Sequence, residues 1–322
     1  MQCSPTSPIL GERRPPSLTS GIQLIGAPFD GFGRVGHQAR AAGALRDAGL
    51  EGAFGEREVG LTDFALPSAD PGRAAGSGLM NEAALLALVE ALREHVGAAL
   101  TTGRFPIVHG GECSVLLGAV SALRDHHGEA GLVFVDGHED TTPLDVSPDG
   151  EAANMEVGLL LGITGQLAPA HLRRHLPALE PAALAVLGPR DHALRRTLNL
   201  ASLADRGVLL RGYEAIAADP ARIAREAVEH VRQSSPAWWL HTDLDVLAQD
   251  IFTAGRVPDD EDEPGGLDWS QLTELTLAAL ACGGCAGWSI AIYDPEQDPD
   301  GVEARRIVQY VTEVAALLPD RP

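Results

Sequence analysis

Residues 132–140 have the sequence LVFVDGHED, and this stretch decides the fold class. Four apolar residues lead directly into Asp136, His138 and Asp140, at the point where a buried strand is expected to end. Alternate residues of an extended segment point to the same side, so these three polar side chains can face one centre. The stretch predicts either half of a metal site or an acidic loop with helix-capping aspartates.

Similar apolar runs recur along the chain and predict further buried strands: GIQLIGAP at 21–28, FPIVHGG at 105–111, ALAVLGPR at 183–190, GVLLRGY at 207–213, WWLHTDLDV at 238–246 and GWSIAIYDP at 287–295. Helix-length amphipathic segments lie between them, at 81–100, 219–233, 269–281 and 302–318. Strands that alternate with helices along a whole chain predict the α/β class, as a three-layer α/β/α sandwich around a mainly parallel sheet.

The domain organisation is expected to be simple. Residues 1–20 are rich in proline and serine, with little periodic apolar content, and predict a flexible N-terminal segment. No linker-like break divides the rest, so residues 21–322 are predicted to form a single domain.

Composition narrows the function classes. The chain has 45 acidic and 24 basic residues and a formal charge of -21, which disfavours binding to nucleic acid or to an anionic membrane. No segment approaches the roughly 20 apolar residues of a membrane helix, and the N-terminus does not resemble a signal peptide. We therefore expect a cytoplasmic protein whose partner is a small molecule.

Three predicted strands end in potential metal ligands: His109, Glu112 and Cys113; Asp136, His138 and Asp140; and His241, Asp243 and Asp245. The carboxyl ends of parallel strands meet at one edge of a sheet, where ligands bind. Several carboxylates that converge there would repel one another unless cations neutralised them. The pattern therefore predicts two divalent ions, of Mn, Zn or Fe, and a bridging hydroxide for hydrolysis.

A family resemblance follows from these motifs. HGGECS at 109–114, VDGHED at 135–140, HTDLDVL at 241–247 and EPGGLDWSQL at 263–272 resemble, in order and spacing, motifs of the ureohydrolases, the arginase and agmatinase family of binuclear manganese enzymes. GHQARAAGALRDAGL at 36–50 and LGPRD at 187–191 are also similar to family segments. The resemblance covers the chain from about residue 22 onward and implies an arginase-like domain that assembles into homo-trimers or hexamers.

The resemblance also implies a ligand set. Asp136 and Asp243 would bridge the two ions, Asp140 would bind the first ion, and His138 and Asp245 the second. The remaining ligand of the first ion would be Cys113, where the family has histidine. Mn²⁺ is the expected metal, but a thiolate is softer than an imidazole and would favour Zn or Fe, unless Cys113 is only a packed thiol.

Two departures from the family pattern concern the substrate. In DVSPDGEAANMEV at 145–157, the positions of the arginase serine, asparagine and shuttle histidine are held by Asp149, Glu151 and Ala153. Asp149, Glu151 and Asn154 are our candidate substrate-binding residues, and the two acids should favour a cationic or amide-like group over a carboxylate.

The second departure lies at the last strand. Ile292 stands where the family has the glutamate that holds the guanidinium. Either another acid substitutes, with Glu151, Asp294 and Glu296 as candidates, or the substrate is not a guanidine. His109 is open to two interpretations, as an acid or base near the metals or as a strand-end histidine bonded to backbone.

These features predict a metal-dependent hydrolase of the arginase and agmatinase type. A metal-bound hydroxide would cleave a C–N bond of a linear amidine or guanidino compound, with Asp140 and His138 as the catalytic residues. Two alternatives stay open at this point. One is an enzyme with an amide, formimino or hydroxyguanidine substrate, and the other is a catalytically silent binding or oligomer subunit.

Overall fold

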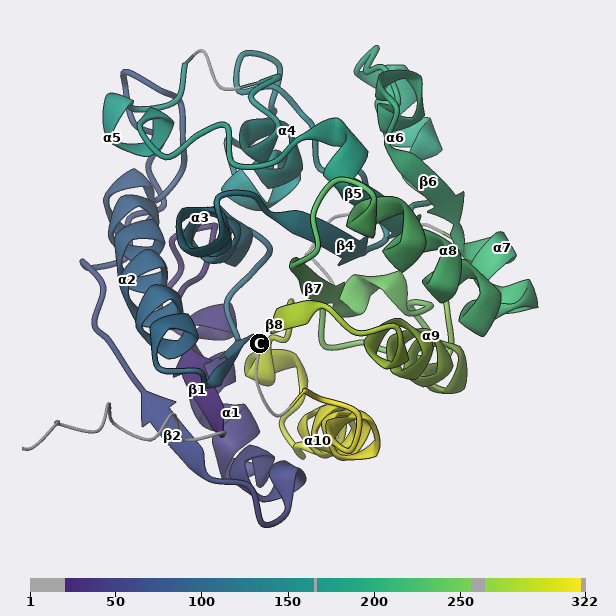
Figure 1. The fold of residues 1–322 in the computed structure, drawn as a ribbon. Helices are drawn as coiled ribbons and strands as arrows, with labels where there is room; N and C mark the ends of the chain where they lie inside the picture. The colour runs from purple at the N-terminus through teal and green to yellow at the C-terminus, as the bar shows by residue number, and fades with distance from the viewer. Residues whose placement is uncertain (1–20, 165–166, 256–263, 320–322) are drawn as a thin grey trace, which may run out of the picture.

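The computed structural model of the 322-residue chain describes residues 21–164, 167–255 and 264–319 (Figure 1). The segment 1–20, predicted to be flexible, lies outside these residues.

The core of the described fold is one eight-stranded sheet in the order β2-β1-β3-β8-β7-β4-β5-β6. Every pairing between neighbouring strands is parallel, which confirms the predicted sheet. The strands are β1 (Ile22–Gly26), β2 (Val59–Thr62), β3 (Phe105–His109), β4 (Gly131–Val135), β5 (Leu184–Gly188), β6 (Leu209–Gly212), β7 (Trp238–Asp243) and β8 (Cys285–Ala291).

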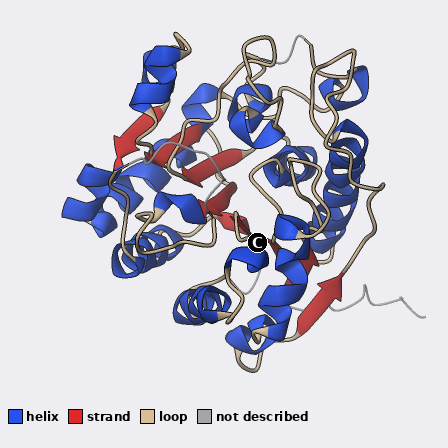
Figure 2. Ribbon diagram, turned by 180° about the vertical axis from the view of Figure 1, so that it is seen from behind, coloured by secondary structure: helices blue, strands red, loops and turns tan. Residues whose placement is uncertain are grey.

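Helices cover both faces of this sheet, so that strands lie between two helical layers (Figures 1 and 2). One layer contains α1 (Ala41–Asp47), α8 (Pro220–Arg232), α9 (Trp269–Ala281) and α10 (Val302–Ala315), and the other contains α2 (Glu82–Thr101), α3 (Val115–His127) and α4 (Glu156–Leu160). The short helices α5 (Ala170–Arg173), α6 (His192–Thr197) and α7 (Tyr213–Ala218) complete the set. The predicted three-layer architecture is therefore confirmed.

The alternation of side chains along each strand builds both layers. In β4, Val133 and Val135 pack into one core cluster while Leu132 and Phe134 pack into the other. Both faces of such a strand are buried, which is why its sequence is continuously apolar rather than alternating.

Local signals explain where the long helices begin. Asp268 caps α9 through a capping box with Gln271, and Asp219 caps α8, whose first residue is Pro220.

No helix in the described part of the chain has the length and apolar content needed to cross a membrane.

The four central strands of the sheet are, in spatial order, β3, β8, β7 and β4. In the chain, β5 and β6 come between β4 and β7. The carboxyl ends of the four central strands therefore lie side by side. Each of these ends leads into one of the polar segments singled out in the sequence, and this arrangement positions the candidate site.

Candidate metal centre and active site

The segment after β4 supplies the first group of polar side chains. Asp136 is fully buried, and its Oδ1 accepts a hydrogen bond from the backbone N–H of His138 at 2.7 Å. Asp140 is 8% exposed and has a positive φ of 43°, a conformation that aspartate tolerates better than most residues. This sharp turn lets Asp136, His138 and Asp140 present ligand atoms within 4.8 Å of one another.

The end of β7 supplies the second group. The Oδ1 of Asp243 accepts from the backbone N–H of Asp245 at 2.6 Å, and the Oδ1 of Asp245 accepts from the backbone N–H of Gly137 at 2.9 Å. His138 Nδ1 lies 3.0 Å from Asp245 Oδ2. These contacts join the β7 end to the β4 loop, so the residues predicted from two separate motifs meet in one place.

Electrostatic crowding marks this centre. Burial, reinforced by the charge of Asp245, raises the pKa of Asp136 to about 7. Burial also raises the pKa of Asp140 well above its usual range, and the charge of Glu156 adds to this effect. The pKa of Asp243 is likewise raised well above its usual range by burial and by the charge of Asp245. Burial acts on Asp245 in the same direction, yet the nearby imidazole of His138 holds its pKa below the usual value. The centre therefore concentrates buried acids that a cation would stabilise.

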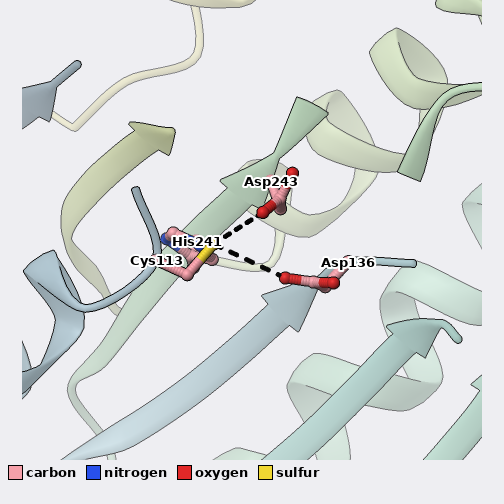
Figure 3. A group of neighbouring side chains, drawn as sticks. All are labelled: Cys113, Asp136, His241 and Asp243. Carbon is pink, nitrogen blue, oxygen red and sulfur yellow. Dashed lines mark hydrogen bonds between the residues drawn. The ribbon is translucent and has the colours of Figure 1, made fainter. Parts of the chain in front are cut away.

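Cys113, which follows β3, lies at the buried side of this centre (Figure 3). Its Sγ lies 2.6 Å from Asp243 Oδ2, 3.2 Å from His241 Nε2 and 3.7 Å from Asp136 Oδ2. Burial and the charge of Asp243 raise the pKa of the Cys113 thiol. Cys113 is thus placed among the other predicted ligands and is not merely a packed thiol at a distance from them.

Glu156, at the start of α4, is a second residue of the buried side. Its side chain is fully buried, and neither carboxylate oxygen has a hydrogen-bond partner within the described parts of the chain. One of its oxygens lies within 4.8 Å of ligand atoms of Cys113 and Asp140. Burial, with the charge of Asp136, raises the pKa of Glu156 well above its usual range. A buried carboxylate without a partner is costly in water-excluded surroundings, so this side chain suits a cation.

The donor set fits divalent metal ions. Among the described residues there are three groups whose donor atoms, within each group, lie within 4.8 Å of one another: Cys113, Asp136, His241 and Asp243; Cys113, Asp140 and Glu156; and Asp136, His138 and Asp140. Carboxylates, imidazoles and a thiolate are ligands of Mn, Fe and Zn. The shared members link the three groups into one centre.

The candidate substrate-binding residues lie in the loop before α4. Asp149 accepts hydrogen bonds from Ser147 Oγ, from the backbone N–H of Glu151 and from Asn154 Nδ2. Asp149 and Asn154 therefore bind each other and shape the loop. Glu151 is buried with Glu112 beside Gly31, where a Cβ on the glycine would meet both side chains. Of the three, Glu151 is the one that lies beside another buried acid, Glu112.

Ile292 forms an apolar wall beside the centre. It is 8% exposed and packs with Cys113, Ala291 and Ala153 in a small cluster. Its φ of 61° is exceptional for a β-branched residue, and such strain persists where the surroundings enforce it. Asp294 and Glu296, two acids considered as substitutes for the family glutamate, instead contact His37, with Asp294 Oδ2 2.9 Å from His37 Nδ1.

For two residues of the centre, the sequence motifs predicted no role. His241 was counted among the strand-end residues, and its position two residues before Asp243 was the available signal. Glu156 was overlooked, although an acid in the apolar run MEVGLLL is unusual. His109, in contrast, is fully buried, belongs to none of the three donor groups, and has no partner at either ring nitrogen among the described residues. Among the described residues, the His109 imidazole therefore makes no hydrogen bond to the backbone.

Known proteins share this fold. The structure superposes on arginase from Bacillus caldovelox, native at pH 5.6, with a TM-score of 0.78 and 21% identity over 92% of this chain and 98% of that chain. It superposes on formimidoylglutamase from Bacillus subtilis with a TM-score of 0.68 and 20% identity over 93% and 88% of the two chains. At these identities the similarity shows the fold.

Sequence comparison identifies the family. The chain is 27% identical to an arginase of Staphylococcus aureus strain MRSA252 over 177 residues, which are 53% of this chain and 57% of that protein. The matched stretch thus spans little more than half of the relative's length. The family model described as Arginase family matches residues 20–316. Because this match spans most of the sequence, the chain belongs to the arginase family.

Proposed function

We propose that this protein is a hydrolase that uses two divalent metal ions to cleave a C–N bond of a linear amidine or a related small molecule. The observation that carries the proposal is the convergence of Asp136, Asp140 and Asp243 with their neighbours at the carboxyl edge of the four central strands. Membership of the arginase family supports a ureohydrolase-type reaction.

The residues that would hold the ions are those brought together at the centre: Cys113, Asp136, His138, Asp140, Asp243 and Asp245. Divalent ions bound there would lower the pKa of water and polarise a trigonal carbon. Mn²⁺ is the metal suggested by the family resemblance, and Zn²⁺ or Fe²⁺ by the thiol of Cys113.

The chain's own groups would position substrate and protons. Asp140 is buried beside the other carboxylates of the centre, where one of its oxygens could accept a proton during the reaction. His138 and Asp245 retain side-chain exposures of 29% and 23%, which makes their side of the centre the route for substrate. Arg190 donates to the backbone carbonyl of Asp245 at 2.6 Å and so fixes that side chain's segment.

The substrate proposal follows from Ile292 and from the neighbouring buried acids Glu151 and Glu112. Ile292 cannot pair with a guanidinium group, which favours a less strongly hydrogen-bonding reacting group such as a formimino group. Glu151 and Glu112 can bind a cationic group at another part of the substrate. We therefore place formimino compounds beside guanidines as candidate substrates.

A substrate panel tests the proposal. Metal-loaded protein would be incubated with L-arginine, agmatine and formimidoylglutamate, and the carbon-containing product (urea from the guanidines, formamide from the formimino compound) would be measured together with the released amine. We expect turnover of at least one compound, which Asp140→Asn abolishes. Absence of turnover across a wider panel of amidines and amides, in protein that holds two ions per chain, would favour a catalytically silent subunit.

The assembly of the protein is a separate proposal. The family resemblance leads us to propose a homo-trimer or hexamer. Light scattering on the eluting protein would measure the mass of the assembly, and a monomer at micromolar concentration would contradict it.

A further inference from the structure

We propose that His241 is a ligand of the buried metal position, and that the Cys113–His241 pair makes this position prefer Zn²⁺ to Mn²⁺. The inference rests on the proposed metal centre, because it assigns one of that centre's ligands. In effect, the imidazole absent at residue 113 is supplied from β7, which β8 separates from β3 in the sheet.

The location of His241 is the first argument. It is fully buried in β7, two residues before Asp243, so both side chains point to the same side of the strand. Figure 3 shows its ring beside the Cys113 sulfur, which faces the carboxylates of Asp243 and Asp136. Ligand atoms of all four residues lie within 4.8 Å of one another.

The contacts of the imidazole are the second argument. His241 Nδ1 lies 2.7 Å from Ser289 Oγ, which also accepts a hydrogen bond from Trp239 Nε1 at 2.9 Å. The ring of Phe134 stacks on the imidazole, with the two planes 9° apart. When Nδ1 donates its proton to Ser289, Nε2 carries the lone pair and faces the sulfur. Metal-binding histidines have this arrangement, in which the other ring nitrogen donates to a fixed oxygen.

Two carboxylates resemble the imidazole in having one atom held by a hydrogen bond and another turned toward the sulfur. Asp136 and Asp243 both use Oδ1 to accept a backbone N–H and turn Oδ2 toward Cys113 Sγ. The sulfur therefore faces two carboxylate oxygens and one imidazole nitrogen. A thiol has one proton and can satisfy one of these three acceptors, whereas a cation would satisfy all of them together with the thiolate.

The distances suit a small four-coordinate ion. Ligand atoms around a tetrahedral Zn²⁺ lie roughly 3.3–3.7 Å apart, since the metal–ligand distances are 2.0–2.3 Å. The separations of Sγ from His241 Nε2 and from Asp136 Oδ2 are 3.2 and 3.7 Å. The 2.6 Å contact with Asp243 Oδ2 would have to lengthen. Thiolate and imidazole in one ligand set favour Zn²⁺, whereas Mn²⁺ prefers oxygen ligands.

His109 provides a matched control. Like His241, it is fully buried at the carboxyl end of a central strand, and burial lowers the pKa of each imidazole to about 3. It differs in that no group of potential ligands in the described part of the chain includes it. Replacement of either histidine by glutamine therefore removes a buried imidazole, but only the replacement of His241 removes a proposed metal ligand.

The experiment measures metal affinity instead of activity. Metal-free wild type, His241→Gln and His109→Gln would be titrated with Zn²⁺ and with Mn²⁺ against a competing chelator. Loss of a residue that only orients a metal ligand typically lowers metal affinity by roughly 10–100-fold. Loss of a ligand itself should cost more, so we expect His241→Gln to weaken the tighter Zn²⁺ site by more than about 100-fold. Mn²⁺ affinity should change much less, and His109→Gln should bind Zn²⁺ like wild type.

Wild-type zinc affinity in folded His241→Gln would overturn the inference and leave the proposed function standing. A wild type that binds neither metal would overturn both. Circular dichroism would show whether His241→Gln folds. If it does not, X-ray absorption at the zinc edge would be measured on His138→Gln protein with one Zn²⁺ equivalent, because this variant lacks the other imidazole proposed as a ligand. Sulfur and imidazole scattering there would support His241 as the ligand, and a shell without imidazole would overturn it.

Discussion

The two sides of the candidate metal centre differ in both exposure and composition. On the open side, His138 and Asp245 keep side-chain exposures of 29% and 23%, and both match the family pattern. On the buried side, Cys113, His241 and Glu156 are at most 1% exposed, and Cys113 departs from that pattern. We infer that the open half of such a centre can keep the family's residues while its buried half takes donors from β7, α4 and the segment after β3.

The largest effect is expected where the two sides share a residue. Asp243 contacts Cys113 through Oδ2 and holds the backbone of Asp245 through Oδ1. Asp243→Asn should therefore weaken both metal positions, with activity reduced by more than about 100-fold. Elemental analysis and turnover would be measured on the same sample. Retention of two ions per chain by this variant would break the view that Asp243 joins the two sides.

Glu156 sharpens the comparison through stability. Its carboxylate is buried without a hydrogen-bond partner in the part of the chain that the structure describes, so the metal-free protein bears an uncompensated cost. We expect Glu156→Met, which puts an apolar side chain of similar length in place of the carboxyl group, to raise the free energy of unfolding of metal-free protein by about 1–3 kcal/mol, measured by urea denaturation with a chelator present. A loss of stability in metal-free protein would show that Glu156 has a structural role that its contacts do not reveal.

Restoring the family residue at the buried side should alter metal preference. In Cys113→His an imidazole replaces the thiolate, which makes the ligand set harder. The ratio of Zn²⁺ to Mn²⁺ affinity should fall by roughly tenfold, or about 1.4 kcal/mol. Competition titrations would measure both affinities, and Cys285→Ser serves as a control because Cys285 is buried at the opposite end of β8. An unchanged ratio would mean that Cys113 does not bind metal.

The smallest effect concerns His109, outside the centre. Burial lowers its pKa from 6.5 to about 3, so the folded protein keeps this imidazole neutral while the unfolded chain takes up a proton below pH 6.5. The stability that depends on the neutral ring is present above pH 6.5 and is lost as the pH falls toward 3. Between pH 7 and pH 5.5, wild type should lose about 1 kcal/mol more than His109→Gln. Equal pH slopes in urea denaturation would contradict this.

Much of the fold could be predicted from the sequence, because each buried strand is a short apolar run that ends in a polar or glycine-rich turn. The exception is β2 at the sheet edge, where Val59–Thr62 is four residues long and partly exposed, so its pattern is weak. Edge strands bury one face less completely than central strands, and their sequences carry less signal.

The site could be predicted in part. Asp136, Asp140 and Asp243 are recognisable because alternate residues at strand ends face one side. The role of His241 depends on β7 lying beside β8 and near the segment after β3, and this strand order does not follow from local periodicity. Glu156 is similar, since its approach to Cys113 is set by how α4 packs against α3.

Metal content tests the central claim most directly. Wild-type protein would be dialysed against equal concentrations of Zn²⁺ and Mn²⁺, washed free of unbound metal, and analysed for both elements. We expect two metal equivalents per chain, with zinc filling at least one of them because Cys113 and His241 form the buried side. Protein that keeps neither metal, or keeps two equivalents of manganese and no zinc, would contradict it.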